Sequence, residues 1–164
     1  MKAIDLIRWA LQKTDAWATG AAEDLRDVPL LQPTPRGGNH PLWILGHLAL
    51  VEGSIPHILF GEPNPVERWR PLFDQGTQPT TDASAYPPFE EVLSTYRDLR
   101  AKNLARLESI GEAGLDSAPA SIPPGFEDEM STKGHTLLVI ALHQMVHVGQ
   151  LTDVRRASGR EPRF

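Results

Sequence analysis

Two of the six histidines in this chain are spaced so that they can act together. His143 and His147 lie four residues apart in the apolar segment 136–151. On a helix, residues at this spacing share one face, with Cβ atoms about 5–6 Å apart. Two neutral imidazoles in an apolar helix each need a partner for the ring nitrogen that carries no proton. A divalent cation meets both needs, so the pair predicts a metal site. The alternative is two core histidines satisfied by polar neighbours or water.

A third histidine strengthens the prediction of a metal site. His47 lies in the apolar run WILGHLAL, where Gly46 removes bulk beside it. A single histidine on an apolar face is more often a core residue than a ligand. Beside the pair, however, it gives three imidazoles from two helices, an open tripod typical of catalytic metal sites. Because the chain has no cysteine, any metal must be bound by His, Asp or Glu.

Two further residues are candidates for a supporting role beside the metal. Gln150 follows His147 by three residues and therefore points to the same side of the helix. It could orient a ligand imidazole or a substrate, although a surface position is the alternative. His40 precedes Pro41 and belongs to the entry of a helix, where it could lie near the site. The sequence identifies no catalytic residue beyond these candidates.

The other two histidines, His57 and His135, are expected at the surface or at helix ends, as is His40. At 100° per residue, His135 is turned about 80° away from His143, and His57 is similarly displaced from His47. For the same reason we do not expect Glu52 to be a direct metal ligand, since it is turned about 140° from His47.

The segment from His143 to His147 also has the spacing of a zinc-protease helix. In those enzymes a glutamate after the first histidine is the general base, but here that position is Gln144. The sequence therefore argues against a metalloprotease.

Composition excludes several further classes of protein. The chain has 164 residues, with 16 basic and 21 acidic side chains and a net charge of −5. This balance argues against nucleic-acid binding driven by phosphate contacts. No uninterrupted apolar run approaches the roughly 18 residues of a membrane span, and the charged N-terminal segment does not resemble a signal peptide. The absence of cysteine excludes disulfides and thiolate nucleophiles. We therefore expect a cytoplasmic protein with neither membrane nor nucleic acid as a partner.

Four long helices are predicted to position the histidines. Apolar residues recur at spacings of three and four, and capping and stop residues mark the helix ends. The fourth helix is apolar almost all round and is predicted to be the most buried. The first expected helix covers residues 3–26. The second begins at Pro41, is capped by Asn39 or His40, is kinked or shortened at Pro56 and is closed by Gly61. The third covers 88–110 and is ended by Gly111, and the fourth runs from a cap at Ser131 or Thr132 to Ser158, followed by Gly159.

These helices predict an all-α fold, a four-helix bundle forming a single domain over residues 1–164. The connections are 27–40, 61–87 and 112–130, and residues 65–73 could form a short helical turn. The longest connection, 61–87, holds five prolines and is predicted to cross the bundle, so that the second and third helices run parallel. The first and second helices, and the third and fourth, would then be antiparallel neighbours.

The metal is expected to open to solvent at the end of the bundle where the second helix begins. His47 lies about six residues from Pro41, which places the metal roughly 9 Å below that rim. Loop 27–40 should line the opening, with Asn39 and His40 as its nearest polar groups, and loop 61–87 would contribute if it folds back. Gln150 would face this cavity rather than bulk solvent.

The segment NHPLWILGHLALVE (39–52), followed by His-x-x-x-His-x-Gly-Gln-Leu over 143–151, resembles the DinB/YfiT-like superfamily. Helix order, loop lengths and domain size extend the resemblance over essentially the whole chain. It implies an up-down-down-up bundle, with nickel or zinc on His47, His143 and His147. It also implies a homodimer, because members often dimerise. Many members carry an acidic residue at the position of Gln144, which puts a role as a base in doubt here.

Characterised relatives in that superfamily include metal-dependent thiol S-transferases and mycothiol-dependent maleylpyruvate isomerases. The resemblance therefore implies a transferase that uses bacillithiol or a similar low-molecular-weight thiol. A bound cation lowers the pKa of a coordinated thiol without a protein base, which suits a chain that has no cysteine of its own. The alternatives are a metal-hydroxide hydrolase, a non-catalytic metal-binding bundle related to stress, and a structural helical dimer whose histidines are coincidental.

Overall fold

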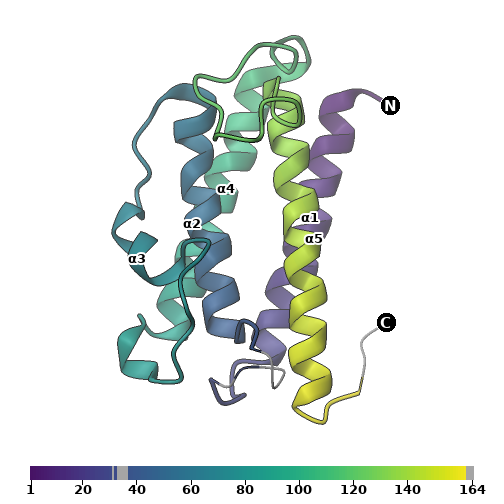
Figure 1. Cartoon of the computed structure of the whole chain (residues 1–164). Coiled ribbons are helices and arrows are strands. Elements are labelled where there is room, and N and C mark those ends of the chain that lie inside the picture. The colour runs from purple at the N-terminus through teal and green to yellow at the C-terminus, as the bar shows by residue number, and fades with distance from the viewer. Residues whose placement is uncertain (31, 33–36, 162–164) are drawn as a thin grey trace.

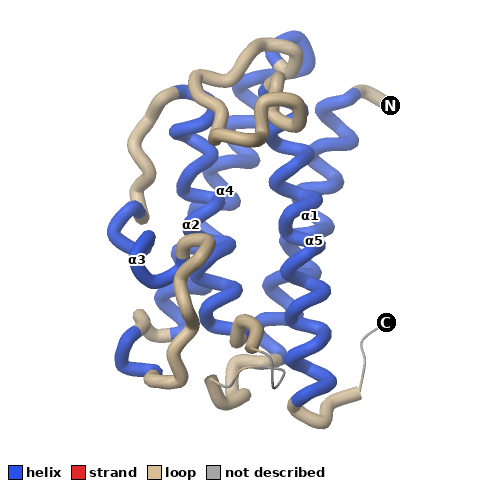
Figure 2. The backbone as a smooth tube through the Cα atoms, viewed as in Figure 1, coloured by secondary structure: helices blue, strands red, loops and turns tan. Residues whose placement is uncertain are grey.

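Helices make up all the regular structure of the described chain. The computed structural model describes residues 1–30, 32 and 37–161, and this part of the chain contains helices and loops but no strand (Figure 2). The predicted all-α class is confirmed. The α-helices are α1 (Ala3–Asp24), α2 (Pro41–Phe60), α3 (Arg70–Phe73), α4 (Phe89–Gly114) and α5 (Lys133–Ala157), with short 3-10 helices η1 (Glu67–Trp69) and η2 (Ala83–Ala85) in the connection between α2 and α4.

The four long helices pack as two pairs, α1 with α5 and α2 with α4 (Figure 1). Both pairs are parallel, because the chain in Figure 1 runs down α1, up α2, up α4 and down α5. Side chains at the helix ends agree: Asp24 at the end of α1 pairs with Arg155 near the end of α5. At the other end of the bundle, Glu112 of α4 accepts hydrogen bonds from the amides of Ala3 and Ile4, at the start of α1.

This pairing corrects the expected neighbours. The first and second helices, and the third and fourth, were predicted to be antiparallel neighbours, but α1 contacts α2 far less than it contacts α5. The reason is the long crossover, which returns the chain to the end where α2 began and lays α4 along α2. As a result, the first and last helices, α1 and α5, pack against each other although they are distant in sequence.

The ends of α2 follow the predicted signals. Pro41 is its first residue, and the Nδ1 of His40 accepts a hydrogen bond from the amide of Trp43 at 3.1 Å, which makes His40 the N-cap. Pro56 lies within the helix without ending it. Gly61 ends the helix with φ 74°, a left-handed conformation that favours glycine.

The other long helices differ from the prediction by small amounts. α1 ends at Asp24 rather than at residue 26. The backbone of α4 leaves the helical region at Gly111, with φ 63° and ψ 173°, but a further turn continues to Gly114. Thr132 caps α5 by accepting from the amide of His135, as expected.

A layer of buried polar side chains divides the core into two apolar clusters. One cluster lies toward the end where α2 begins, and the other toward the end where α1 begins. Each long helix contributes apolar residues to both clusters, and buried polar residues lie between these two contributions. We call these residues the polar layer: Thr14, Glu52, Tyr96, Arg100, Asn103 and Gln144, all less than a tenth exposed.

The most buried helix is α2, and the prediction for α5 is wrong. Both α2 and α5 have the length and mean hydropathy of a membrane span. This was not expected from the sequence, because neither helix contains a long uninterrupted apolar run. In α2 the apolar segment is 83% buried, but in α5 only 44%. The crossover, α4 and α5 all cover α2, so its apolar character is that of a core helix. On α5, Leu142 and Val146 are 60% and 62% exposed.

Candidate metal centre

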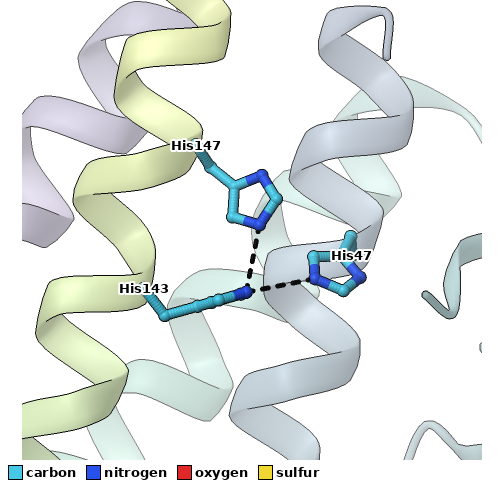
Figure 3. A group of neighbouring side chains, drawn as sticks. All are labelled: His47, His143 and His147. Carbon is cyan, nitrogen blue, oxygen red and sulfur yellow. Dashed lines mark hydrogen bonds between the residues drawn. The ribbon is translucent and has the colours of Figure 1, made fainter. Parts of the chain in front are cut away.

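His47 of α2 and His143 and His147 of α5 point toward one another across the space between the two helices (Figure 3). The Nε2 atom of His143 lies 3.1 Å from that of His147 and 3.4 Å from that of His47. One ligand atom from each ring lies within 4.8 Å of the other two. Within the described residues, this group is made of imidazoles alone. The structure therefore brings the three predicted ligands together.

Hydrogen bonds at the far side of two rings fix which nitrogen is bare. The Nδ1 of His47 lies 2.8 Å from the backbone oxygen of Phe73, which can only accept, so the proton is on Nδ1. The Nδ1 of His147 lies 3.0 Å from Oε1 of Gln150, and Asn39 donates to the same oxygen at 3.5 Å. Both rings consequently present the lone pair of Nε2 to the centre of the group.

This donor set fits a divalent metal. Two bare Nε2 atoms face the Nε2 of His143, whose Nδ1 is buried without a hydrogen-bond partner. A single N–H on that ring cannot serve both neighbours well, whereas a cation would accept all three lone pairs. Tetrahedral zinc, with Zn–N distances of about 2.0–2.1 Å, sets its ligand nitrogens about 3.3–3.4 Å apart. The observed separations of 3.1 and 3.4 Å are close to that spacing.

Burial keeps the three imidazoles neutral at physiological pH. Burial and, to a smaller extent, the nearby His47 together lower the pKa of His143 to about 4. Burial, together with the neighbouring His143 and His47, lowers the pKa of His147 to about 3. The pKa of His47 is also lowered by burial, against an opposing hydrogen bond to Phe73. Neutral imidazoles are the form that binds metal, so no proton has to leave near pH 7.

His47 is held in place by close packing of the crossover on α2. A Cβ at Gly46 would lie 2.3 Å from the ring of Phe73, so the fully buried Phe73 fits only because residue 46 has no side chain. The same residue supplies the carbonyl that binds His47. One turn earlier, Trp43 stacks on the His47 ring, with centroids 5.1 Å apart and planes 5° apart.

The crossover follows the first half of α2 over further contacts. The hydroxyl of Thr77 accepts from Trp43 Nε1 at 3.0 Å, and the carbonyl of Thr80 lies 3.1 Å from Nε2 of His40. Loop 61–87 therefore folds back over the beginning of α2. It reaches the aromatic rings at positions 40, 43 and 47 in turn. The role of Phe73 could not be predicted from the sequence, because the group that contacts His47 is a backbone carbonyl.

The remaining candidates fall outside the tripod. His40 caps α2, as expected of a residue at a helix end, but its side chain is buried rather than exposed. Both ring nitrogens have partners: Nδ1 accepts from the amide of Trp43, and Nε2 lies near the carbonyl of Thr80. His57 and His135 are exposed, as expected. Gln150 does not contact the centre directly but binds His147 from behind.

Gln144 and Glu52 both lie in the polar layer. Gln144 accepts from Thr14 and donates to Tyr96, so it faces the core on the other side of α5. A carboxylate at this position would share that orientation. Glu52 pairs with Arg100 at 2.7 Å. Burial raises the pKa of Glu52, and the guanidinium of Arg100 opposes that rise.

The opening of the site is described in part. His143 is partly buried, whereas His47 and His147 are buried. From loop 27–40, Asn39 reaches the site through its hydrogen bond to Gln150. Residues 31 and 33–36 of that predicted lining lie outside the described residues.

Comparison with known proteins identifies one family. The profile of the DinB superfamily matches residues 8–151, a range that contains all three histidines. The resemblance drawn from the sequence is thereby confirmed. No curated protein matches the chain.

Proposed function

Since the chain belongs to the DinB superfamily, we propose that it binds one divalent ion, zinc or nickel, through His47, His143 and His147 and acts as a metal-dependent transferase on a low-molecular-weight thiol. The observation that carries the proposal is the convergence of three Nε2 atoms, two of them held bare by hydrogen bonds at Nδ1. We also propose that the order of helix directions is the up-down-down-up topology of the family.

A bound divalent cation lowers the pKa of a coordinated thiol, so that the thiolate is available near neutral pH. The chain itself supplies the frame for this chemistry. Three imidazoles would leave at least one coordination position of the metal free for a ligand, and His143 is the least buried of the three. Trp43 and Phe73 pack around His47 and keep water from that side of the tripod.

Among the described residues no carboxylate base belongs to the tripod, and this favours a thiol over water as the reacting ligand. The histidine group includes no carboxylate among the described residues, and Gln144 faces the core. A thiol, being far more acidic than water, can release its proton to solvent once its pKa has fallen. A hydrolase gains more from a neighbouring carboxylate and is the second candidate; a non-catalytic metal-binding bundle is the third.

Polar groups next to the tripod suit a hydrophilic thiol. The amides of Asn39 and Gln150 lie in one hydrogen-bonded chain that ends on His147. We propose that they orient the polar part of the thiol. A cytoplasmic location fits this substrate class, because small thiols are kept reduced there.

Metal content is the first test. Protein expressed without a histidine tag should contain about one zinc or nickel ion per chain by mass spectrometry of the elements. The His143→Ala variant should lose it, whereas His57→Ala, at an exposed histidine, should keep it. A wild-type protein that is folded, yet contains no metal and takes up none in titration, would refute the whole proposal.

Turnover separates the transferase from the other candidates. Metal-loaded protein should accelerate the reaction of monochlorobimane with one member of a panel of thiols, including bacillithiol, mycothiol and glutathione. The His143→Ala variant should show only the uncatalysed rate. Bound metal without any acceleration across the panel would favour the non-catalytic bundle.

A further inference from the structure

Three residues contain all the buried side-chain nitrogen and oxygen atoms that lack a hydrogen-bond partner in the described part of the chain. They are Asp15 at Oδ1, Arg100 at its three guanidinium nitrogens, and His143 at Nδ1. The Arg100 side chain is 2% exposed, and its contact with Glu52 compensates its charge but not its N–H groups. Buried polar atoms in folded proteins are nearly always paired, and ordered water or an ion is the partner where side chains are not. These atoms therefore indicate a bound group inside the bundle.

Asp15 and Arg100 face the same interior space. Asp15 lies on the core face of α1, four residues after Leu11 and three before Ala18, both of which are buried. Burial raises the pKa of Glu52, and the carboxylate of Asp15 adds to this rise. Burial lowers the pKa of Arg100, but neighbouring groups, Asp15 among them, raise it overall. Because charges affect one another in this way only when they are near, the Asp15 carboxylate lies close to the ion pair of α2 and α4.

His143 lies at the same level of the bundle. Its neighbour Gln144 accepts a hydrogen bond from Thr14 at 2.5 Å and donates one to Tyr96. These bonds join α5 to α1 and α4 at one level, and Asp15 directly follows Thr14 on α1. Tyr96 lies one turn before the unpartnered guanidinium on α4. The unpartnered atoms of three helices therefore surround one space between the two helix pairs, next to the tripod.

The chemistry of these groups selects water as the occupant. Arg100 offers N–H donors, whereas Asp15 and Glu52 offer carboxylate acceptors. Tyr96 accepts from Gln144, and burial raises the pKa of Tyr96, so its hydroxyl keeps a proton that it can donate. An anion would meet two carboxylates and a cation would meet the guanidinium, but water both donates and accepts. Buried water typically makes about three hydrogen bonds, which this set of groups can provide.

We propose that ordered water molecules bind between Asp15 and Arg100 and extend to Nδ1 of His143. When Nε2 of that ring binds a metal, its proton is on Nδ1, and the water accepts it. The water supports His143 in the way that the carbonyl of Phe73 supports His47. Asp15 and Arg100 are thereby positioning residues for the third ligand. This last step rests on the proposed metal site, whereas the water cluster itself does not.

Long-lived internal water tests the cluster without metal. Magnetic relaxation dispersion of the water oxygen should detect such water in the metal-free wild type. Asp15→Leu removes the acceptor and fills space, so part of this signal should disappear. Asp15→Asn keeps an acceptor and should keep the signal, as should Asp98→Leu, at an exposed carboxylate of α4. No long-lived water in the wild type, or an unchanged signal in a folded Asp15→Leu protein, would overturn the proposal.

A crystal structure of the wild type tests the position of the water without any substitution. Water density should lie within hydrogen-bonding distance of the Arg100 guanidinium, of Oδ1 of Asp15 and of Nδ1 of His143. Direct contacts between these side chains in place of the water would refute the cluster.

Zinc affinity tests the support of His143. Loss of a group behind a metal ligand lowers affinity about 10–100-fold, so competition with a chromophoric chelator should show a loss in this range for Asp15→Leu. Asp15→Asn and Asp98→Leu should bind zinc almost as tightly as the wild type. Equal losses in Asp15→Leu and Asp15→Asn would assign the effect to the charge of Asp15 and refute the link through water. A wild type that binds no zinc would refute the metal site, while the relaxation measurement would still decide whether the water cluster exists.

Discussion

The outer nitrogens of the three histidines differ in their hydrogen bonding, so the position of each ring depends on its surroundings in a different way. His47 relies on a backbone carbonyl, His147 on the side chain of Gln150, and His143 has no partner at Nδ1. Groups behind a metal ligand fix its tautomer and orientation. Of the three, only His147 has a partner that a point substitution can remove without moving the backbone.

Replacing Gln150 should therefore weaken metal binding through His147. In Gln150→Leu the Nδ1–H of His147 loses its acceptor, and loss of such a partner lowers metal affinity about 10–100-fold. Thr152→Val is a suitable control, because the Thr152 hydroxyl bonds only to the carbonyl of Val148 in its own helix. Competition against a chromophoric zinc chelator measures both affinities. Equal affinity in Gln150→Leu and wild type would show that Gln150 has no role behind the ligand.

The lowered pKa values of the histidines predict how stability depends on pH. In the folded metal-free protein the pKa of His143 is about 4 and that of His147 about 3, whereas an unfolded histidine titrates near 6.5. Between these limits the unfolded chain binds more protons, so the free energy of unfolding falls as pH decreases from about 6.5 toward 4. Urea unfolding of metal-free protein at pH 7.5 and pH 5 measures the fall.

Removing the histidines should remove part of this dependence. The double variant His143→Ala/His147→Ala lacks both depressed groups, so its stability should fall less between the two pH values. His57→Ala/His135→Ala, at exposed positions, should keep the wild-type dependence. A double variant at the tripod that loses as much stability on acidification as the wild type would assign the effect to carboxylates.

At the scale of single elements, the crossover is held on α2 by two residues without side chains. Gly46 admits the ring of Phe73, and seven residues later Gly53 admits Asn64 and Val66, to which an added Cβ would come within 2.3 and 2.7 Å. The first contact lies beside the histidine tripod, and the second lies at the start of the crossover. Substitutions at Gly46 and Gly53 can therefore distinguish an effect on the packing of the crossover from an effect on the position of His47.

Alanine at these two positions should have similar effects on stability and different effects on metal. Each substitution forces the crossover outward, and overpacking of this kind typically costs about 1–3 kcal/mol. Gly46→Ala also displaces the Phe73 carbonyl from His47, so it should lower metal affinity markedly, whereas Gly53→Ala should change it little. Chemical denaturation and metal competition provide the two readouts. If both variants bind metal with equal affinity, the carbonyl of Phe73 does not help to position His47 as a ligand.

The sequence predicted the elements better than their environment. Helix ends were predictable because Pro41, Thr132 and Gly61 act on the backbone within one turn of their own positions. The burial of α5 was not, because an apolar helix can face either a core or a partner, and hydropathy does not distinguish them. The tripod was predictable from its i, i+4 pair. Its support by Phe73 was not, since any residue can present a carbonyl.

At the scale of the whole molecule, the polar layer fixes how the four helices align. Its ion pair joins Glu52 of α2 to Arg100 of α4, and Asn103 adds a hydrogen bond to the same carboxylate. Gln144 of α5 connects Thr14 of α1 with the other pair of helices through Tyr96 of α4. A different register would break these contacts and leave Glu52, Asn103 and Gln144 buried without their partners, which supports a single packing arrangement.

Breaking the ion pair on one side should be more harmful than removing both charges. Arg100→Met leaves the Glu52 carboxylate buried without its cation, which typically costs about 3–5 kcal/mol. Adding Glu52→Gln removes that charge and keeps an acceptor for Asn103, so the double variant should recover much of the loss. Urea unfolding of the two single variants and the double variant gives the coupling energy. Additive losses would mean that the two charges do not interact.

The metal would join the two helix pairs, because His47 belongs to α2 and the other two ligands belong to α5. Binding to the folded state adds RT ln(1 + [L]/Kd), about 2.7 kcal/mol at a hundredfold excess over Kd. For a chain of this size that corresponds to a rise in Tm of roughly 5–10 °C. A chelator should therefore lower the Tm of the wild type and of His57→Ala by this amount, and leave His143→Ala nearly unchanged. If chelator lowers all three equally, the cation acts elsewhere; if it lowers only the first two, the tripod is the link between the α1–α5 and α2–α4 halves of the bundle.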